Sequence, residues 1–390
     1  MPMDVPRFIG EHVNPRLIRE GLDTAFQELA SELLKPEYPG LYAFPSRGKD
    51  GGIDGVQDGE SSRVVLECKV VGDDKIETAL SRWREVRDRL DKHLADPSGP
   101  TPGQSQYQPW YRTDRPIQEY ILALSCDLSN LSGHDNLREE ISTFFEVMAD
   151  RHAHLSHLRH LTVEVLDWRQ IQDRLKAKPH LVFRWFPKVR PLGLVPLDEA
   201  QFQGRYHSYL ASDKLPYYSR AAHLAKHGRP VDSPIPNEGE LLALLEHPEK
   251  TGLIVCGAGG VGKTRLAIEI GWLAHQRGWL VLRVGPTFRQ EALDQLAEHL
   301  APDHRVLLLV DYIETQGAFT EIVERINDLN ATLLLRLRYV ATCRTTYYHK
   351  AAATAAQHVK VDLSFPQARM ASGWLKDYRQ ATVGHTAVRL

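Results

Sequence analysis

The residues with the clearest chemical meaning lie in one run, GAGGVGKT, at residues 257–264. The run matches the phosphate-binding pattern G-x-x-x-x-G-K-[ST], in which glycines let main-chain N–H groups curl around phosphate oxygens. These glycines are Gly257, Gly259, Gly260 and Gly262. We expect the Lys263 ammonium to reach the β- and γ-phosphates and the Thr264 hydroxyl to ligate Mg²⁺. The run therefore predicts a site for ATP, or a close relative, with Mg²⁺; the alternative is a glycine-rich turn without a ligand.

Two further runs carry residues that would complete such a site. RVLLLVDYIE reads as a buried strand that delivers Asp311 at its carboxyl end, where it would hold Mg²⁺ through water. The alternative is an aspartate that caps the next helix. Glu314, three residues on, either positions the attacking water or is a solvated carboxylate. LRYVATCR ends in Arg344, which could sense the γ-phosphate.

A different chemistry is suggested by RVVLECKVV in the N-terminal half. Glu67 and Lys69 are two residues apart on this expected strand, so their side chains share one face. Asp54, in the preceding GGIDG turn, could return alongside and complete a triad. Asp54 and Glu67 would bind one or two Mg²⁺ ions, and Lys69 would orient or deprotonate a water that attacks phosphate. By itself E-x-K is a weak signal, because half-exposed strands often carry both residues.

The elements around these residues alternate between strands and helices, which predicts the α/β class. In the N-terminal half, helical spacing of apolar residues marks residues 15–34 and 76–90, and strands are expected at 63–71, 119–125 and 160–166, before a helix at 167–175. We therefore expect one domain at residues 15–186.

Prolines interrupt residues 187–235, which we interpret as a linker. From residue 236 to 365 the order of helices and strands predicts a doubly wound parallel sheet, with the glycine-rich run between its first strand and the next helix. Residues 366–390 read as the start of a helical extension.

Composition narrows the class of protein. The 390 residues carry a net charge of −2, which leaves no general basic footprint for nucleic acid. No apolar run approaches the ~20 residues needed to cross a bilayer, and no signal peptide is evident, so we expect a cytoplasmic protein without a membrane partner. The four cysteines are isolated and are expected to be reduced.

Taken together, GAGGVGKTRLA, LLLVDYIET and VATCRT resemble the STAND class of P-loop signalling NTPases, over residues 236–365. The resemblance implies a switch that exchanges or slowly hydrolyses nucleotide and forms a homo-oligomer when a trigger engages a sensor. The sequence stops at Leu390, without room for the usual winged-helix and repeat modules, so the trigger stays unknown.

Residues 15–186 resemble the Mrr-type restriction endonucleases of the PD-(D/E)xK superfamily. A helix with Phe26 and Glu28, then GKDGGIDG, then VVLECKV, carry the resemblance. It implies Mg²⁺- or Mn²⁺-dependent cleavage of duplex DNA by Asp54, Glu67 and Lys69. Glu28 would supply the helix-borne acid of that family, although Gln27 follows Phe26, where an acid is expected.

The pairing of the two resemblances implies an antiviral defence protein in which an NTPase switch controls a DNA-cutting domain. One alternative is a non-catalytic signalling scaffold with an inactive nuclease fold. Another is an NTP-dependent restriction enzyme that translocates DNA, which would call for helicase motifs and a second RecA-like lobe that the sequence lacks.

Overall fold

The structure is a computed structural model that describes residues 5–18, 20–43, 54–58, 63–99, 107–128, 131–197, 237–315, 319–353 and 357–363. The described part of the chain divides into two compact units, with the boundary between Val189 and Arg190. We call residues before this boundary the first unit and those after it the second unit.

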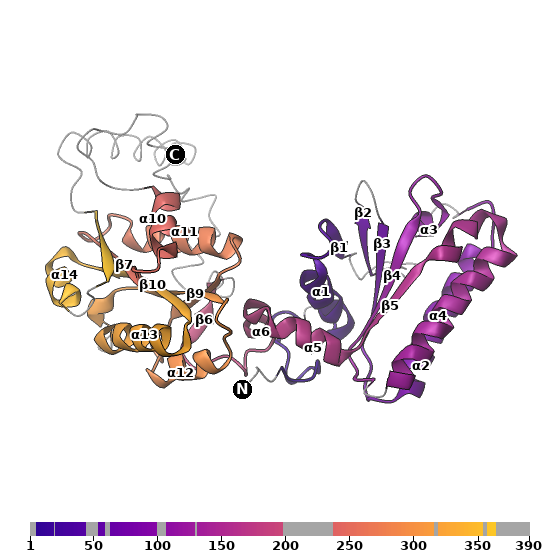
Figure 1. The fold of residues 1–390 in the computed structure, drawn as a ribbon, viewed down its shortest axis with the longest axis horizontal. Helices are drawn as coiled ribbons and strands as arrows, with labels where there is room; N and C mark the ends of the chain where they lie inside the picture. The colour runs from indigo at the N-terminus through magenta and orange to yellow at the C-terminus, as the bar shows by residue number, and fades with distance from the viewer. Residues whose placement is uncertain are drawn as a thin grey trace, which may run out of the picture. The chain divides into compact units, whose positions relative to one another are not determined.

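The first unit is built on a five-stranded sheet in the order β1-β2-β3-β4-β5 (Figure 1). Strands β1, β2 and β3 are antiparallel neighbours, whereas β3, β4 and β5 are parallel. Its elements are α1 (Leu22–Leu34), β1 (Leu41–Ala43), β2 (Gly55–Asp58), β3 (Arg63–Lys69), α2 (Ile76–Leu94), α3 (Gln108–Tyr111), β4 (Ile117–Leu124), α4 (Leu131–Arg151), η2 (Ala153–His160), β5 (Thr162–Leu166), α5 (Trp168–Lys176) and α6 (Pro179–Trp185).

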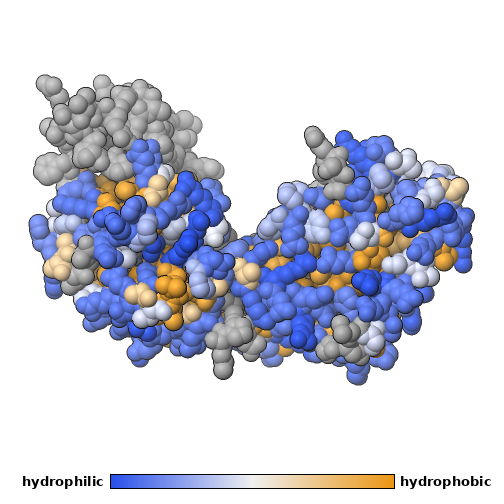
Figure 2. All heavy atoms as spheres, viewed as in Figure 1, coloured by the Kyte–Doolittle hydropathy of each residue, from blue (hydrophilic) through white to orange (hydrophobic). Residues whose placement is uncertain are grey.

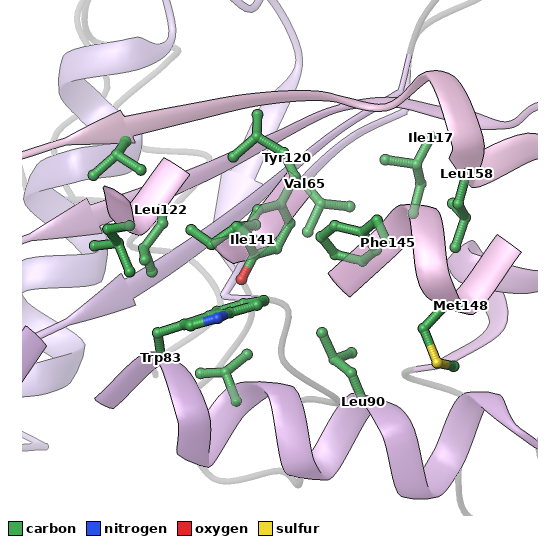
Figure 3. Packing of buried hydrophobic residues seen from close by; sticks show 14 of the residues in the cluster. Val65, Trp83, Leu90, Ile117, Tyr120, Leu122, Ile141, Phe145, Met148 and Leu158 are labelled. Carbon is green, nitrogen blue, oxygen red and sulfur yellow. The ribbon is translucent and has the colours of Figure 1, made fainter. Parts of the chain in front are cut away.

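Aromatic side chains fill the core between this sheet and helices α2 and α4. Figure 3 shows Trp83 of α2 below Tyr120 of β4, with Phe145 of α4 beside them. The ring centroids of Trp83 and Tyr120 lie 6.0 Å apart, and those of Tyr120 and Phe145 lie 5.3 Å apart. This packing fixes α2 over the face of β3 that carries Glu67.

The second unit has a six-stranded sheet in the order β11-β7-β10-β9-β8-β6, in which all neighbours are parallel except β6 and β8. Its strands read as continuous apolar runs because helices cover both faces. Its elements are β6 (Leu194–Pro196), α10 (Glu238–Glu246), β7 (Gly252–Cys256), α11 (Lys263–Gln276), β8 (Leu280–Val284), α12 (Glu291–Glu298), β9 (Arg305–Val310), η3 (Ile313–Thr315), α13 (Phe319–Leu333), β10 (Arg336–Cys343), α14 (Thr345–Ala352) and β11 (His358–Asp362).

Helices α10 and α11 pack on one face of this sheet, and α12 and α13 lie on the other (Figure 1). The first face is apolar, with Leu253 of β7, Leu309 of β9 and Leu266 of α11 in one buried cluster. On the second face the ring of Phe319 meets that of Tyr339 at 5.7 Å. The α/β class with parallel strands that the sequence predicts is confirmed, and this unit is compatible with a P-loop NTPase fold.

Several boundaries differ from those expected from sequence. Residues 194–196, assigned to a linker, form β6 and pair with β8 through Leu194 and Val284. The expected helix at 15–34 begins only at Leu22, after Gly21 with φ of 119°. Helix α4 was not expected at all. The extension at 366–390, most of the linker and the GKDGGI part of the first turn lie outside the described residues.

Among the described residues, no helix combines the length and apolar character that crossing a bilayer needs. All four cysteines are buried and free, as expected. On the face that Figure 2 shows, hydrophilic residues cover most of each unit, which agrees with apolar cores lying inside.

Candidate functional sites

The glycine-rich run forms the loop between β7 and α11, where the sequence places it. Gly260 and Gly262 have φ of 78° and 91°, a region that side chains with a Cβ rarely adopt. A Cβ added at Gly259, Gly260 or Gly262 would meet no atom within 4 Å, so the loop borders open space. Gly262 is also the N-cap of α11, so the loop leads into a helix N-terminus that favours anions.

Lys263 lies at the first residue of α11 and is almost completely buried. Its Nζ donates a hydrogen bond to the main-chain carbonyl of Ala258 at 2.7 Å, across the loop. Burial lowers the pKa of Lys263 from its usual value, and the negative charges of Glu314 and Asp311 oppose this shift. The ammonium is therefore held inside the loop, next to two carboxylates.

Asp311 joins the loop to the neighbouring strands. It directly follows β9, and its Oδ1 accepts hydrogen bonds from Thr264 Oγ1 at 2.8 Å and from Thr342 Oγ1 at 2.6 Å. Thr342 lies on β10, between β7 and β9, and its hydroxyl oxygen also accepts from Tyr312 N at 2.9 Å. Sequence reasoning missed Thr342; a buried threonine at the end of the VATC run was the available signal.

Glu314 and Arg344 lie beside this group. Glu314 is in η3, after Tyr312, which has a positive φ of 54° and whose ring centroid lies 5.8 Å from Lys263 Nζ. Both carboxylate oxygens of Glu314 are buried and accept no hydrogen bond. Its nearest cation is Arg344 Nε at 3.9 Å, and the Arg344 side chain is 70% exposed. The structure thus brings together Lys263, Thr264, Asp311, Glu314 and Arg344 as the sequence suggested.

These residues fit a magnesium nucleotide. An open glycine loop at a helix N-terminus suits phosphate, and a buried lysine can neutralise part of its charge. The Thr264 hydroxyl and Asp311 carboxylate, already in contact, are oxygen ligands of the kind Mg²⁺ prefers. The Glu314 carboxylate, whose oxygens accept no hydrogen bond within the protein, is suited to accept hydrogen bonds from water.

A second group of charged side chains lies on the first unit. Glu67 on β3 is completely buried and contacts Lys69 Nζ through its Oε1. Lys69 Nζ also lies 3.9 Å from Asp54 Oδ2, which accepts a 2.6 Å hydrogen bond from Cys68 N. Asp54 precedes β2, which pairs antiparallel with β3 and returns its carboxylate beside Lys69. The structure therefore brings Asp54, Glu67 and Lys69 together.

The charges around Lys69 determine its protonation state, and with it the role that Lys69 can take. Burial alone would lower the pKa of Lys69, but the carboxylates of Glu67 and Asp54 outweigh it and raise the pKa above its usual range. Lys69 is therefore protonated at neutral pH, a state that orients water or phosphate and does not take up a proton. Arg89 of α2 lies at the same carboxylate, with Nη2 3.5 Å from Glu67 Oε1.

Helix α1, which carries the expected acid Glu28, brings the side chain of Gln27 to this group. Glu28 is exposed on α1, whereas its neighbour Gln27 is buried and donates a hydrogen bond from Nε2 to the main-chain carbonyl of Asp54. One residue of helical rotation, about 100° on a 3.6-residue turn, separates the two side chains. The position that the resemblance assigns to an acid is therefore occupied by an amide.

The described residues contain no group of three or more His, Cys, Asp or Glu side chains arranged to hold a metal ion. Asp54 and Glu67 supply two carboxylates, which is the number that typically binds Mg²⁺ together with waters and substrate phosphate. A metal at this place would therefore need ligands from its substrate.

No family model matches the chain, and no curated protein matches its sequence. Similar solved structures include the S. cerevisiae Hsp104:casein complex in its extended conformation, with 12% identity, a TM-score of 0.31, and coverage of 48% of this chain and 32% of that chain. A Rhizobiales Trip13 has 21% identity and a TM-score of 0.22, and the match covers 36% of this chain and 53% of that chain. The HORMA:CdnC:Trip13 complex of E. coli MS115-1 has 16% identity and a TM-score of 0.26, and the match covers 42% of this chain and 65% of that chain.

The chain therefore spans about a third to two thirds of the length of these three solved structures. Likenesses with such TM-scores and identities carry no argument about function, which rests on the side chains of the two sites.

Proposed function

We propose that the second unit binds Mg-ATP, or a close relative, and hydrolyses it slowly as a switch. The observation that carries this proposal is the 2.8 Å hydrogen bond between Thr264 Oγ1 and Asp311 Oδ1. It links the glycine-rich loop to the end of a strand two places away in the sheet, so two separately expected halves of one site meet. A glycine-rich turn without a ligand would not need this partner.

Each residue has a defined part in this function. The loop N–H groups and the Lys263 ammonium would neutralise phosphate charge, and Thr264 and Asp311 would hold Mg²⁺, which would supply further positive charge against the phosphates. Glu314 accepts a hydrogen bond from the attacking water, for which its two oxygens are available because they accept no hydrogen bond within the protein. Arg344, whose side chain is mostly exposed, contacts the γ-phosphate.

Calorimetric titration with Mg-ATP tests the nucleotide-binding site. Lys263→Ala is expected to abolish binding, because it leaves the phosphate charge without its buried counter-ion. Asp311→Ala should reduce the gain in ATP affinity that Mg²⁺ provides, and it should have a smaller effect on the affinity for the nucleotide itself. Lys350→Ala, which changes an exposed lysine of α14, is the matched control and should bind like the parent. Equal affinity of the Lys263 variant and the parent would refute the nucleotide site.

A second function is favoured by the meeting of Asp54, Glu67 and Lys69 on the first unit. We propose that they cut duplex DNA with Mg²⁺ or Mn²⁺. The metal, held by the two carboxylates, would activate water and stabilise the charge on phosphate. Protonated Lys69 orients the reacting groups, and buried Gln27 holds the Asp54 turn in place.

Cleavage of plasmid DNA tests this second function. Asp54→Ala, Glu67→Ala and Lys69→Ala should each lose metal-dependent cutting while remaining folded. Lys176→Ala, which removes an α5 lysine paired with Asp173, is the control and should cut like the parent. A Lys69 variant that cuts as fast as the parent would refute the mechanism.

Carried by one chain, these functions form an NTPase switch that controls a nuclease, a combination suited to antiphage defence, with homo-oligomerisation on an unknown trigger. A scaffold with an inactive nuclease fold would bind ATP without metal-dependent cutting. An NTP-dependent restriction enzyme would consume ATP in proportion to DNA translocated. Measuring cleavage and ATP turnover on the same DNA separates the three.

A further inference from the structure

Beside the proposed metal site lies a cationic side chain, Arg89, to which the proposed cleavage reaction gives no role. Arg89 projects from α2, whose neighbouring residues Val86 and Leu90 are buried against the sheet. Its guanidinium lies 3.5 Å from Glu67 Oε1, although Glu67 already contacts Lys69. Glu67 is completely buried, whereas the Arg89 side chain is 43% exposed. Arg89 therefore stands between the buried carboxylate and solvent.

Charge balance explains why a second cation lies there. Asp54 and Glu67 carry two negative charges, and Lys69 and Arg89 supply two positive ones. A buried carboxylate needs such compensation, because an unpaired charge in the interior is strongly unfavourable. A divalent cation that approaches Glu67 would be repelled by both of these cations. Metal binding at Glu67 is thus opposed for as long as Arg89 stays in contact.

The contact between Arg89 and Glu67 is suited to release. At 3.5 Å it is longer than the roughly 2.7–2.9 Å of a strong charge-assisted hydrogen bond. Arg174 on the same unit gives the contrast, since it bridges Glu37 and Glu164 at 2.8 and 2.9 Å. Arg89 Nε also donates a hydrogen bond to the main-chain carbonyl of Glu85 on the same helix, and this contact is long as well, at 3.3 Å. The half-exposed side chain can therefore turn while the packed face of α2 stays in place.

A guanidinium released beside a metal-bound carboxylate is well placed for phosphate, which it binds through two parallel hydrogen bonds. We propose that Arg89 holds Glu67 in the absence of metal and, when a divalent metal enters, transfers to a phosphate of the DNA backbone. This role rests on the proposed nuclease function. It makes metal and DNA bind cooperatively, because each favours the position of Arg89 that the other needs.

The test measures Mn²⁺ binding by electron paramagnetic resonance, using the full chain with Asp311→Ala to remove the second metal site. Arg89→Met should bind Mn²⁺ about threefold to tenfold more tightly than its parent without DNA, the range expected for a partly screened ion pair. The same variant should bind a short duplex more weakly in Ca²⁺. Arg82→Met, which removes an α2 arginine paired with Glu85, is the matched control and should change neither affinity.

The outcomes separate this role from the nuclease itself. Glu67→Gln should weaken Mn²⁺ binding; if it does so while Arg89→Met binds Mn²⁺ no more tightly than the parent, the role of Arg89 is overturned and the metal site stands. Equal Mn²⁺ affinity of Glu67→Gln and the parent would overturn both. Arg89→Lys keeps the charge and guards against a misfolded methionine variant; it should retain weak Mn²⁺ binding but lose part of the duplex affinity.

Discussion

Glu314 occupies an unusual position for a carboxylate, because both of its oxygens are buried and accept no hydrogen bond. Such a group costs free energy unless a ligand or water completes it. Tyr312, with its positive φ, and the short η3 turn carry the chain from Asp311 to this place. Two residues separate Glu314 from Asp311 in the sequence, and the turn brings both carboxylates to the same lysine, Lys263.

Glu314→Gln is expected to lower ATP hydrolysis by at least about 100-fold, the usual contribution of a general base. ATP affinity should stay unchanged or rise, since the amide keeps the shape and removes a negative charge near the phosphates. Turnover and calorimetric binding, measured on the same sample, check both parts. Glu321→Gln, at an exposed position of α13, is the control. Undiminished turnover would assign the water to another group.

At the scale of elements, the order β7-β10-β9 decides which side chains meet. Strand β7 begins at Gly252, which pairs in register with Tyr339 of β10. A Cβ at Gly252 would lie 2.3 Å from the Tyr339 ring, so the glycine allows this ring to cover the start of β7. The spacing of β7 and β10, and with it the place of Thr342, depends on that fit.

Gly252→Ala should therefore lower the free energy of unfolding by about 1–3 kcal/mol, the usual cost of overpacking. Gly239→Ala, in α10, provides the opposite case, because its Cβ would meet nothing closer than 3.4 Å and alanine favours helix. Urea unfolding of the two variants checks the contrast. Equal stability of Gly252→Ala and the parent would mean that the Tyr339 ring moves aside at little cost.

A histidine links η2 to α3 in the first unit. His157 Nε2 donates to the carbonyl of Trp110 at 3.0 Å, and its Nδ1 is buried without a hydrogen bond. Burial lowers the pKa of His157 below its usual value of about 6.5. The folded state thus binds the proton less readily than the unfolded state. Its contribution to stability is complete above the unfolded pKa and is lost as pH falls through the folded pKa.

Thermal unfolding between pH 7 and pH 5 should therefore show a smaller loss of stability in His157→Gln than in the parent. His160→Gln, at an exposed position at the end of η2, should retain the parent's slope. The idea fails if all three proteins lose stability in parallel.

Sequence alone could place the strand, loop and helix around Lys263, because these three elements are contiguous and their residue types are constrained. It could not give Thr342, whose role depends on β10 lying between β7 and β9, a matter of topology and not of local pattern. In α4, buried apolar residues recur at helical spacing, and this pattern could have predicted the helix: Leu137, Ile141, Phe145 and Met148. Sequence left the fourth residue of the first unit's site open between Glu28 and the place of Gln27, because neighbouring residues of a helix point about 100° apart and the sequence does not fix which one faces the sheet.

For the whole molecule, the two proposed activities share one chain, and a single nuclease site of the proposed kind would cut only one strand. Nucleotide-driven assembly would bring two sites together, provided that nucleotide binds the assembled state more tightly. Arg344 gives a means for this preference, since its exposed side chain could contact a γ-phosphate.

Sedimentation and DNA cleavage should therefore differ among samples with no nucleotide, ADP and a non-hydrolysable ATP analogue, given the trigger. The ATP analogue should give the largest particle and the most double-strand breaks. Arg344→Ala should abolish the difference between ADP and the analogue while still binding both. Identical mass and cutting in all three states would mean that the units are only tethered.

Strand β6 has a practical consequence for dissecting the protein. Its residues 194–196 belong to the edge of the second sheet, although they lie within the proline-interrupted segment 187–235. A fragment that starts at residue 236 would strip β6 away and expose the N–H and C=O groups of β8 as an open sheet edge, a template for aggregation. One that starts at Arg190 would keep that edge covered. Recombinant work on the isolated second unit should place its first residue there.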